Sequence, residues 1–180
     1  SSRALDNIQK LTDARTVAVV TGQQMGFFTG PLYTIYKAIG TAKLCAFYQD
    51  QFPDYQFVPI FWMELEDHDF EEIRSIHLLT AENDIRKISY GGRDPANAAR
   101  DPVNKIALDA DIARVIGEIK ETLNKTDFTE ALFQNIEGAY AEGHSVAEGF
   151  GKWMAALLGK FGLILMDPSD REFKNLAKPV

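Results

Sequence analysis

Residues 16–31 read TVAVVTGQQMGFFTGP, and this stretch decides the fold. It opens with a short run rich in β-branched residues, which is typical of a buried strand. A loop with three glycines follows, at Gly22, Gly26 and Gly30, and Pro31 suits the first position of a helix. The pattern predicts a strand, a glycine-bearing loop and a helix in direct succession.

The same alternation continues outward from this stretch. A helix is predicted over 32–48, a second apolar strand over 57–63 and a last one over 163–166. Between the last two strands, three apolar stripes with helical spacing predict three further helices. Their members are Ile112, Val115, Ile116, Ile119 and Leu123; Leu132, Phe133, Ile136 and Tyr140; and Val146, Phe150, Trp153, Met154, Leu157, Leu158 and Phe161. Continuous apolar strands that alternate with helices predict an α/β fold with a doubly wound, mainly parallel sheet.

One stretch breaks the alternation. Residues 85–90 and 103–108 look like two partly exposed strands, separated by a Gly- and Pro-containing segment. We interpret residues 78–110 as an insertion or an antiparallel hairpin within one core domain over 1–180. The chain begins without Met and ends at Val180, which suggests a piece of a longer protein.

Composition narrows the class of protein. The net charge is −7 and the pI is about 5.0, and the Lys and Arg residues form no basic run, which argues against nucleic-acid binding. The longest apolar runs are of strand length, so no membrane helix is expected. The single Cys45 cannot form an internal disulfide, which fits a reducing cytoplasm, and its apolar neighbours predict a buried structural thiol.

Polar side chains follow three of the predicted strands at the point where each strand ends. Ligands bind beyond the carboxyl ends of parallel strands, so we expect these side chains to form the site. The first strand delivers Thr21, Gly22, Gln23 and Gln24, the second Glu64, Glu66, Asp67, His68 and Asp69, and the last Asp167.

The glycine loop has neither the dinucleotide fingerprint nor the P-loop spacing. A loop that enters a helix can still present backbone N–H groups and a positive dipole end to an anion. Thr34 and Lys37 share a helix face, and the long Lys37 side chain leans toward the helix start. A tight turn beside a solvated lysine explains the same residues equally well.

Glu66, Asp67, His68 and Asp69 place three carboxylates around one imidazole. Such crowding suits proton transfer near neutral pH. The ligand types would also suit a metal, but no His-x-His, His-Glu-x-x-His or Cys-x-x-Cys spacing accompanies them, so no metal is expected. A charged turn that caps a helix is the plainer alternative.

Two long segments resemble the bacillithiol-biosynthesis cysteine-adding enzymes, a family of cysteine ligases. The first reads VVTGQQ-x-G-x-FTGPLYTIYK over 19–37, and the second VPIFWME-x-EDHDFEE over 58–72. A weaker match reads FGLILMDPSD over 161–170. The resemblance covers the chain from about Val17 to its end.

This resemblance implies a Rossmann-like core related to nucleotidyltransferases and class I aminoacyl-tRNA synthetases. It also implies a reaction that joins cysteine to glucosaminyl-malate through an amide bond. ATP is the expected activator, because a carboxylate acylates poorly without a phosphate leaving group. Those synthetases carry His-x-Gly-His at the first helix, whereas residues 29–34 read TGPLYT, so the ATP requirement stays open. Family members are longer and carry a coiled coil associated with homodimers.

The working hypothesis is therefore a cysteine ligase core. The loop from Gly22 to Pro31, with Gly30, Thr34 and Lys37, would hold a nucleotide phosphate or an anionic substrate group. Asp67 and His68 would be catalytic, and Glu66, Asp69 and Asp167 would line the crevice. A non-catalytic ligand-binding domain and a metal-assisted hydrolase built on Glu64, Asp67, His68 and Asp69 are the alternatives.

Overall fold

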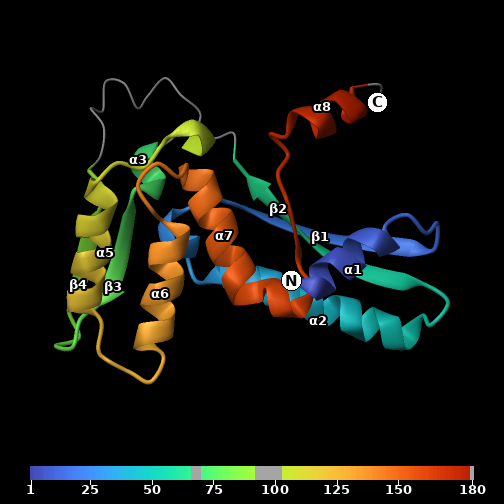
Figure 1. Ribbon diagram of the computed structural model, residues 1–180. Coiled ribbons are helices and arrows are strands. Elements are labelled where there is room, and N and C mark those ends of the chain that lie inside the picture. Colours follow the sequence, from blue (N-terminus) through green and yellow to red (C-terminus); the bar gives the residue numbers. More distant parts are fainter. Residues whose placement is uncertain (66–69, 92–102, 179–180) are drawn as a thin grey trace. The chain divides into compact units, whose positions relative to one another are not determined.

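The computed structural model describes residues 1–65, 70–91 and 103–178, which form two compact units (Figure 1). The first, which we call the sheet unit, comprises Ser1–Gln24, Pro31–Leu65 and Met154–Val180. The second, the helical unit, comprises Met25–Gly30 and Glu66–Trp153. Whether the chain behaves as one domain with an insertion over about 78–110 stays a prediction.

The sheet unit contains a parallel sheet of three strands in the order β1-β2-β5. These strands are β1 (Thr16–Gln24), β2 (Gln56–Glu64) and β5 (Ile164–Met166), and helix α2 (Tyr33–Gln51) connects the first two. A parallel pair needs such a crossover, and a helix is its usual form. The predicted α/β class with a parallel sheet is confirmed.

Strand β2 is central and covered on both faces. Val58 and Ile60 point to one face and Phe61 and Met63 to the other, and none is more than 8% exposed. This burial explains the continuous apolar run in the sequence. The prediction was wrong for β1, which is an edge strand of the described sheet and leaves Val20 56% exposed.

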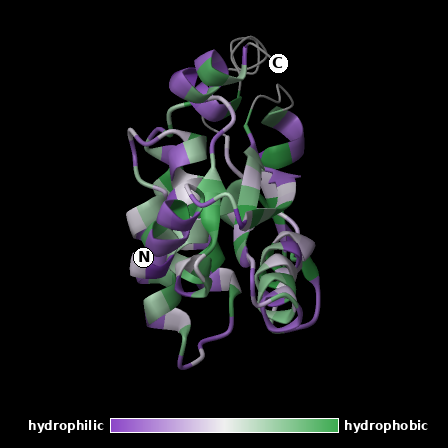
Figure 2. Ribbon diagram, turned by 90° about the vertical axis from the view of Figure 1, so that its right-hand side faces the viewer, coloured by the Kyte–Doolittle hydropathy of each residue, from purple (hydrophilic) through white to green (hydrophobic). Residues whose placement is uncertain are grey.

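Two helices pack on the strands of the sheet unit. Helix α1 (Ser2–Lys10) contacts β2 and β5, and α2 contacts β1 and β2. The buried face of α2 carries Thr34, Ala38, Thr41 and Cys45, which recur every three or four residues. Cys45 is buried, as the sequence predicted, and burial raises the pKa of its thiol to about 11. Figure 2 shows hydrophobic residues concentrated in the strands, whereas the helices are of mixed polarity.

The helical unit contains α3 (Phe70–Ile73), the strands β3 (Ser75–Leu79) and β4 (Ile85–Ser89), and α5 (Asp111–Thr122), α6 (Thr129–Ala139) and most of α7 (Val146–Leu158). Strand β4 pairs antiparallel with β3. The expected pairing of 85–90 with 103–108 was therefore wrong. Val103–Lys105 forms a 3₁₀ turn, and Ala107 bridges to Ser145 instead.

The three predicted helical stripes are largely confirmed. Fully or nearly fully buried members include Ile112, Val115, Ile116, Ile119, Phe133, Ile136, Tyr140, Val146, Phe150, Trp153, Met154 and Leu158. Leu123, Leu132 and Leu157 are half-buried. Phe161 is 42% exposed, because α7 ends at Leu158 and a 3₁₀ turn follows. A short helix, α8 (Arg171–Ala177), comes after β5 in the sheet unit.

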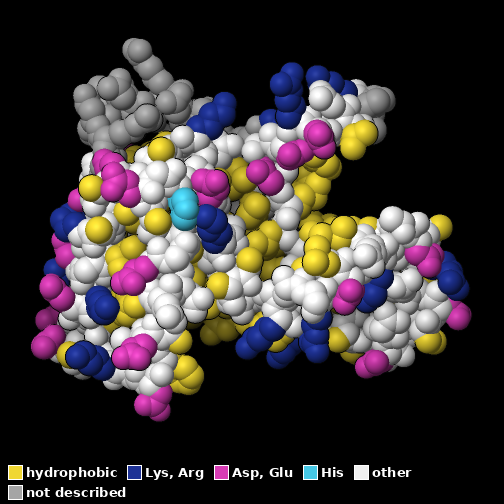
Figure 3. All heavy atoms as spheres, in the orientation of Figure 1, with side chains coloured by type: hydrophobic (Ala, Val, Ile, Leu, Met, Phe, Trp, Pro, Cys, Tyr) yellow, Lys and Arg dark blue, Asp and Glu magenta, His cyan; other side chains and the backbone are white. Residues whose placement is uncertain are grey.

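Charged side chains of both signs occur across the face drawn in Figure 3, with apolar side chains among them. The expectation that the chain does not bind nucleic acid stays a prediction. Within the described part of the chain, no helix combines the length and the apolar character needed to cross a bilayer.

Candidate functional site

The carboxyl ends of the three strands in the sheet unit place part of the predicted polar set at one edge. Gln24 of β1 is in register with Glu64 of β2, and Trp62 of β2 with Met166 of β5. Asp167 follows directly after β5. The end of β1, Glu64 and Asp167 therefore lie at the same edge of the sheet, where open parallel sheets bind ligands.

Lys37 places a cation at the end of β1. Its Nζ donates to the carbonyl oxygen of Gly22 at 3.3 Å and to Oε1 of Gln23 at 3.0 Å. It also lies 5.2 Å from the centre of the Tyr33 ring. These partners are all neutral, and among the described residues no carboxylate forms an ion pair with Lys37. The described part of the chain thus positions the ammonium without an anionic partner, which suits an incoming anion.

Thr34, one turn before Lys37 on α2, is fully buried. Its Oγ1 has no hydrogen-bond partner among the described residues. An unpaired buried hydroxyl is costly, so it needs a specific explanation, of which a ligand oxygen or an ordered water is one.

The start of α2 differs from the sequence-based expectation. The helix begins at Tyr33 rather than at Pro31, and Leu32 at the cap position supplies no side-chain hydrogen bond. The N–H groups of Thr34 and Ile35 already donate to the carbonyl oxygens of Pro31 and Leu32, at 2.9 and 3.1 Å. Fewer backbone donors are therefore free to bind an anion than a helix start offers in general.

Gly22 has a packing role in the sheet. A Cβ atom at this position would lie 2.9 Å from the carbonyl oxygen and 3.1 Å from the Cβ of Trp62 on β2. Any side chain here would push the two strands apart. Strand packing alone therefore explains why residue 22 is a glycine, without any ligand.

The second half of the glycine loop belongs to the helical unit and has an unusual backbone. Phe28, Thr29 and Gly30 all have positive φ, of 55°, 86° and 64°. A Cβ at Gly26 would lie 2.9 Å from the Cα of Gly30, so the two glycines pack backbone against backbone. Positive φ at a bulky residue is strained and persists only where the surroundings enforce it.

Tyr140, which the sequence suggested only as a core residue of α6, holds this loop. Its buried hydroxyl accepts a hydrogen bond from the N–H of Phe28 at 3.1 Å, and its ring contacts those of Phe27 and Phe28. Gly149 makes room for the ring, because a Cβ there would lie 2.5 Å from Cδ1 of Tyr140. Burial raises the pKa of Tyr140 well above its ordinary value, so the hydroxyl stays protonated. No local sequence signal connects Tyr140 to residues 28–30.

Asp167 is exposed at the end of β5 and is partly engaged by its own turn. Its Oδ1 accepts hydrogen bonds from the N–H of Ser169 at 2.8 Å and from its Oγ at 2.6 Å. In the next element, Phe173 of α8 lies edge-on to Trp62, with the ring centres 6.0 Å apart. Asp167 thus stabilises the turn after β5 in addition to lying at the strand-end edge.

The four residues Glu66, Asp67, His68 and Asp69 lie outside the described residues. Their predicted roles in proton transfer and in lining a crevice therefore stay predictions. In the part of the chain that the structure describes, no group of three or more His, Cys, Asp or Glu side chains could hold a metal ion. The metal-assisted hydrolase rests on Asp67, His68 and Asp69, so this finding does not test it.

Comparison with known proteins gives one consistent result. A family model described as "Bacillithiol biosynthesis BshC, N-terminal Rossmann-like domain" matches residues 1–180. Curated relatives named "Putative cysteine ligase BshC" include proteins of Salinibacter ruber, 40% identical over 99% of this chain, and of Chlorobaculum tepidum, 38% identical over the whole chain. The chain covers 32% and 31% of these relatives, which is about a third of their length.

Proposed function

Because the chain belongs to the family of BshC N-terminal Rossmann-like domains, we propose that it forms the core of a cysteine ligase of bacillithiol biosynthesis. The proposed reaction joins the carboxylate of cysteine to the amine of glucosaminyl-malate and forms an amide. The name carried by the relatives supports this activity. The observation in the chain itself that supports it best is Lys37, a positioned ammonium without a described anionic partner at the strand-end edge.

The anion-binding part of the site follows from the chemistry of the substrates. The malate group carries two carboxylates, and a phosphorylated activator carries several anionic oxygens. We assign Lys37 and the hydroxyl of Thr34 to one such anionic group, with Thr21, Gln23 and Gln24 from the end of β1 beside them. Gly22, Gly30 and Pro31 set the path of the backbone around this place.

The acid–base part of the site is assigned to Asp67 and His68. Amide formation from a carboxylate and an amine releases water, and the attacking amine must lose a proton. We propose that Asp67 and His68 take up that proton, while Glu66, Asp69 and Asp167 line the crevice. ATP is proposed to activate the cysteine carboxylate, so that phosphate or AMP leaves in place of hydroxide.

The same proposal places the protein in the cytoplasm, where cysteine and a reducing environment are available. Its partners are then small-molecule substrates, with a homodimer in the full-length protein. A non-catalytic ligand-binding domain and a metal-assisted hydrolase are the alternatives that the test must separate.

The test measures binding and turnover separately. The chain is titrated with glucosaminyl-malate by calorimetry, and we expect Lys37→Met to weaken binding by roughly threefold to tenfold. Lys43→Met, on the same helix, is the matched control and should leave the affinity unchanged. Unaltered affinity in Lys37→Met would remove Lys37 from the site.

For turnover, the chain and the longer Salinibacter ruber relative are incubated with glucosaminyl-malate and cysteine, with and without ATP, and the amide is measured by mass spectrometry. Product from neither protein under either condition would exclude the ligase. Binding without product would favour the ligand-binding domain. A divalent ion at one equivalent per purified chain would favour the hydrolase.

A further inference from the structure

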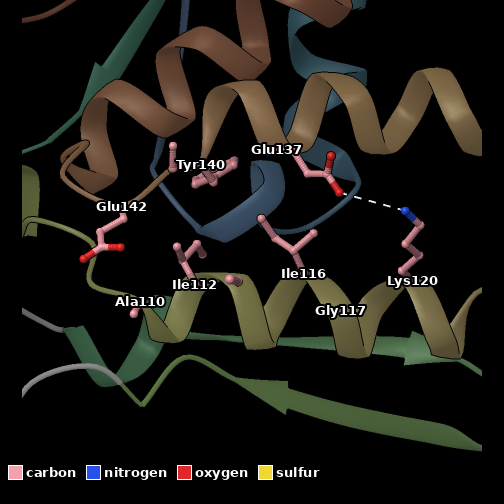
Figure 4. Close-up of a pocket in the computed structure, with 10 residues that line it drawn as sticks. Ala110, Ile112, Ile116, Gly117, Lys120, Glu137, Tyr140 and Glu142 are labelled. Atoms are coloured by element: carbon pink, nitrogen blue, oxygen red, sulfur yellow. Dashed lines mark ion pairs between the residues drawn. The ribbon is translucent and has the colours of Figure 1, made fainter.

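A groove of about 390 Å³ lies between helices α5 and α6, wholly within the helical unit (Figure 4). Its floor is made of Ile112, Ile116 and Tyr140, which are at most 6% exposed. In Figure 4, Ile112 and Ile116 point from α5 toward α6. The volume lies in the range of small-molecule sites in proteins, and such sites are mainly apolar with few polar groups.

Small residues create this space. Ala110, Ala113 and Gly117 recur on one side of α5, and Ala141 lies at the end of α6. A Cβ atom at Gly117 would meet no atom within 4 Å, so the helices are not packed tightly there. Apolar side chains that line an unfilled groove lack dispersion contacts on that side. A ligand of the right shape would supply these contacts.

The charged groups at the ends of the groove indicate the sign of the charge that a ligand would carry. At one end, Nζ of Lys120 lies 4.0 Å from a carboxylate oxygen of Glu137 and 5.5 Å from the centre of the Phe133 ring. Glu142 lines the groove near Ala110, at the other end. Among the described residues, no cation pairs with Glu142. Lys120 thus has its counter-charge, whereas the described residues supply none for Glu142.

We propose that the groove between α5 and α6 binds a small molecule with an apolar body and a positively charged amine. The apolar body lies against Ile112, Ile116 and the Tyr140 ring, and the amine lies toward the Glu142 carboxylate. The lining carries one lysine and two glutamates, so its net charge of −1 also favours a cation over an anion. The groove belongs to the helical unit alone, and this proposal does not rest on the proposed function.

The experiment uses three probes of one shape, 2-phenylethylammonium, 2-phenylethanol and 3-phenylpropionate, titrated into the ¹⁵N-labelled chain. We expect saturable amide shifts confined to residues of α5, α6 and the segment that carries Glu142. Because Glu142 is exposed, the ammonium should bind only about two- to fivefold more tightly than the alcohol. The carboxylate should bind most weakly. Tighter binding of the carboxylate, or no saturable shift with any probe, would overturn the proposal.

Two substitutions locate the probe. Gly117→Leu fills the groove and should weaken binding at least about tenfold. Gly138→Leu is the matched control, because a Cβ there also meets nothing within 4 Å and Gly138 does not line the groove. Both replace a helical glycine by a strong helix former, so both variants should fold, as their melting temperatures will verify.

Glu142→Gln should remove the advantage of the ammonium and leave the affinity for the alcohol unchanged. If the ammonium probe bound the Gly117→Leu variant as tightly as the unsubstituted chain, the groove would not be its binding site. Concentration-dependent association of the chain that Gly117→Leu abolishes would assign the groove to a second copy, and the small-molecule proposal would fall.

Discussion

Replacing Tyr140 by phenylalanine tests the inference that its hydroxyl holds the loop at Phe28. The substitution keeps the ring, so the contacts with Phe27 and Phe28 remain and no large cavity forms. What disappears is the acceptor, 3.1 Å away, for the N–H of Phe28. A fully buried donor without a partner costs about 1–3 kcal/mol, and this bond is only partly buried, so the lower half of that range applies. Part of this cost is offset, because the freed loop can relax the strained positive φ of Phe28 and Thr29. We therefore expect a net loss of about 1–2 kcal/mol.

The assay is native-state hydrogen exchange at the Phe28 amide. A loss of this size should speed its exchange about 5- to 30-fold. Tyr36→Phe is the control, because Tyr36 is 66% exposed and its hydroxyl can bond to water. Gly149→Ala would place a Cβ 2.5 Å from Cδ1 of the same ring, so it should also speed exchange at Phe28 while the hydroxyl is kept. Unchanged protection of the Phe28 amide in Tyr140→Phe would refute the reasoning.

Two further predictions concern stability. Gly22→Ala should lower the free energy of unfolding by about 1–3 kcal/mol, because its Cβ would lie 2.9 Å from the Trp62 carbonyl oxygen. Gly40→Ala, in the open, should raise the free energy of unfolding by up to about 1 kcal/mol. Both are measured by urea titration, and equal effects would contradict the packing role of Gly22. Burial raises the pKa of Tyr90 from about 10 to about 12, so its stabilising contribution is complete below pH 10 and is lost as the pH rises toward 12. The Tyr90 hydroxyl donates to Oδ1 of Asp109 at 3.0 Å, a bond that only the protonated form makes. Tyr90→Phe should therefore flatten this alkaline loss in a pH series of urea midpoints.

The sheet could be predicted because its central strand is covered on both faces. A strand such as β2, with Val58 and Phe61 buried on opposite faces, leaves a continuous apolar run that a half-exposed strand lacks. The edge position of β1 could not be predicted, because its β-branched run reads the same whether Val20 is buried or exposed. Burial depends on which strands lie beside it, and the run itself carries no such information.

The hairpin was mispaired for a related reason. Residues 75–79 and 103–108 are both short and mixed in polarity, so pattern alone does not select the partner of β4. The structure selects the nearer segment, through a tight turn in which Asn83 has a φ of 65° and the N–H of Thr80 donates to the carbonyl oxygen of Asp84 at 2.8 Å. Asn tolerates this backbone well, and that preference was the available signal.

The glycines that first suggested an anion-binding loop are explained by packing, whereas two neighbouring polar residues are not. Gly22 allows two strands to approach, and Gly26 and Gly30 pack backbone against backbone, so none of the three needs a ligand to explain it. Packing does not explain Lys37, whose charge no described carboxylate neutralises, or Thr34, whose buried hydroxyl lacks a described partner. An anion-binding test based on the glycines would therefore report mainly on stability. Substitution of Lys37 changes charge at an exposed position, and it is the change that can separate the ligand from the fold.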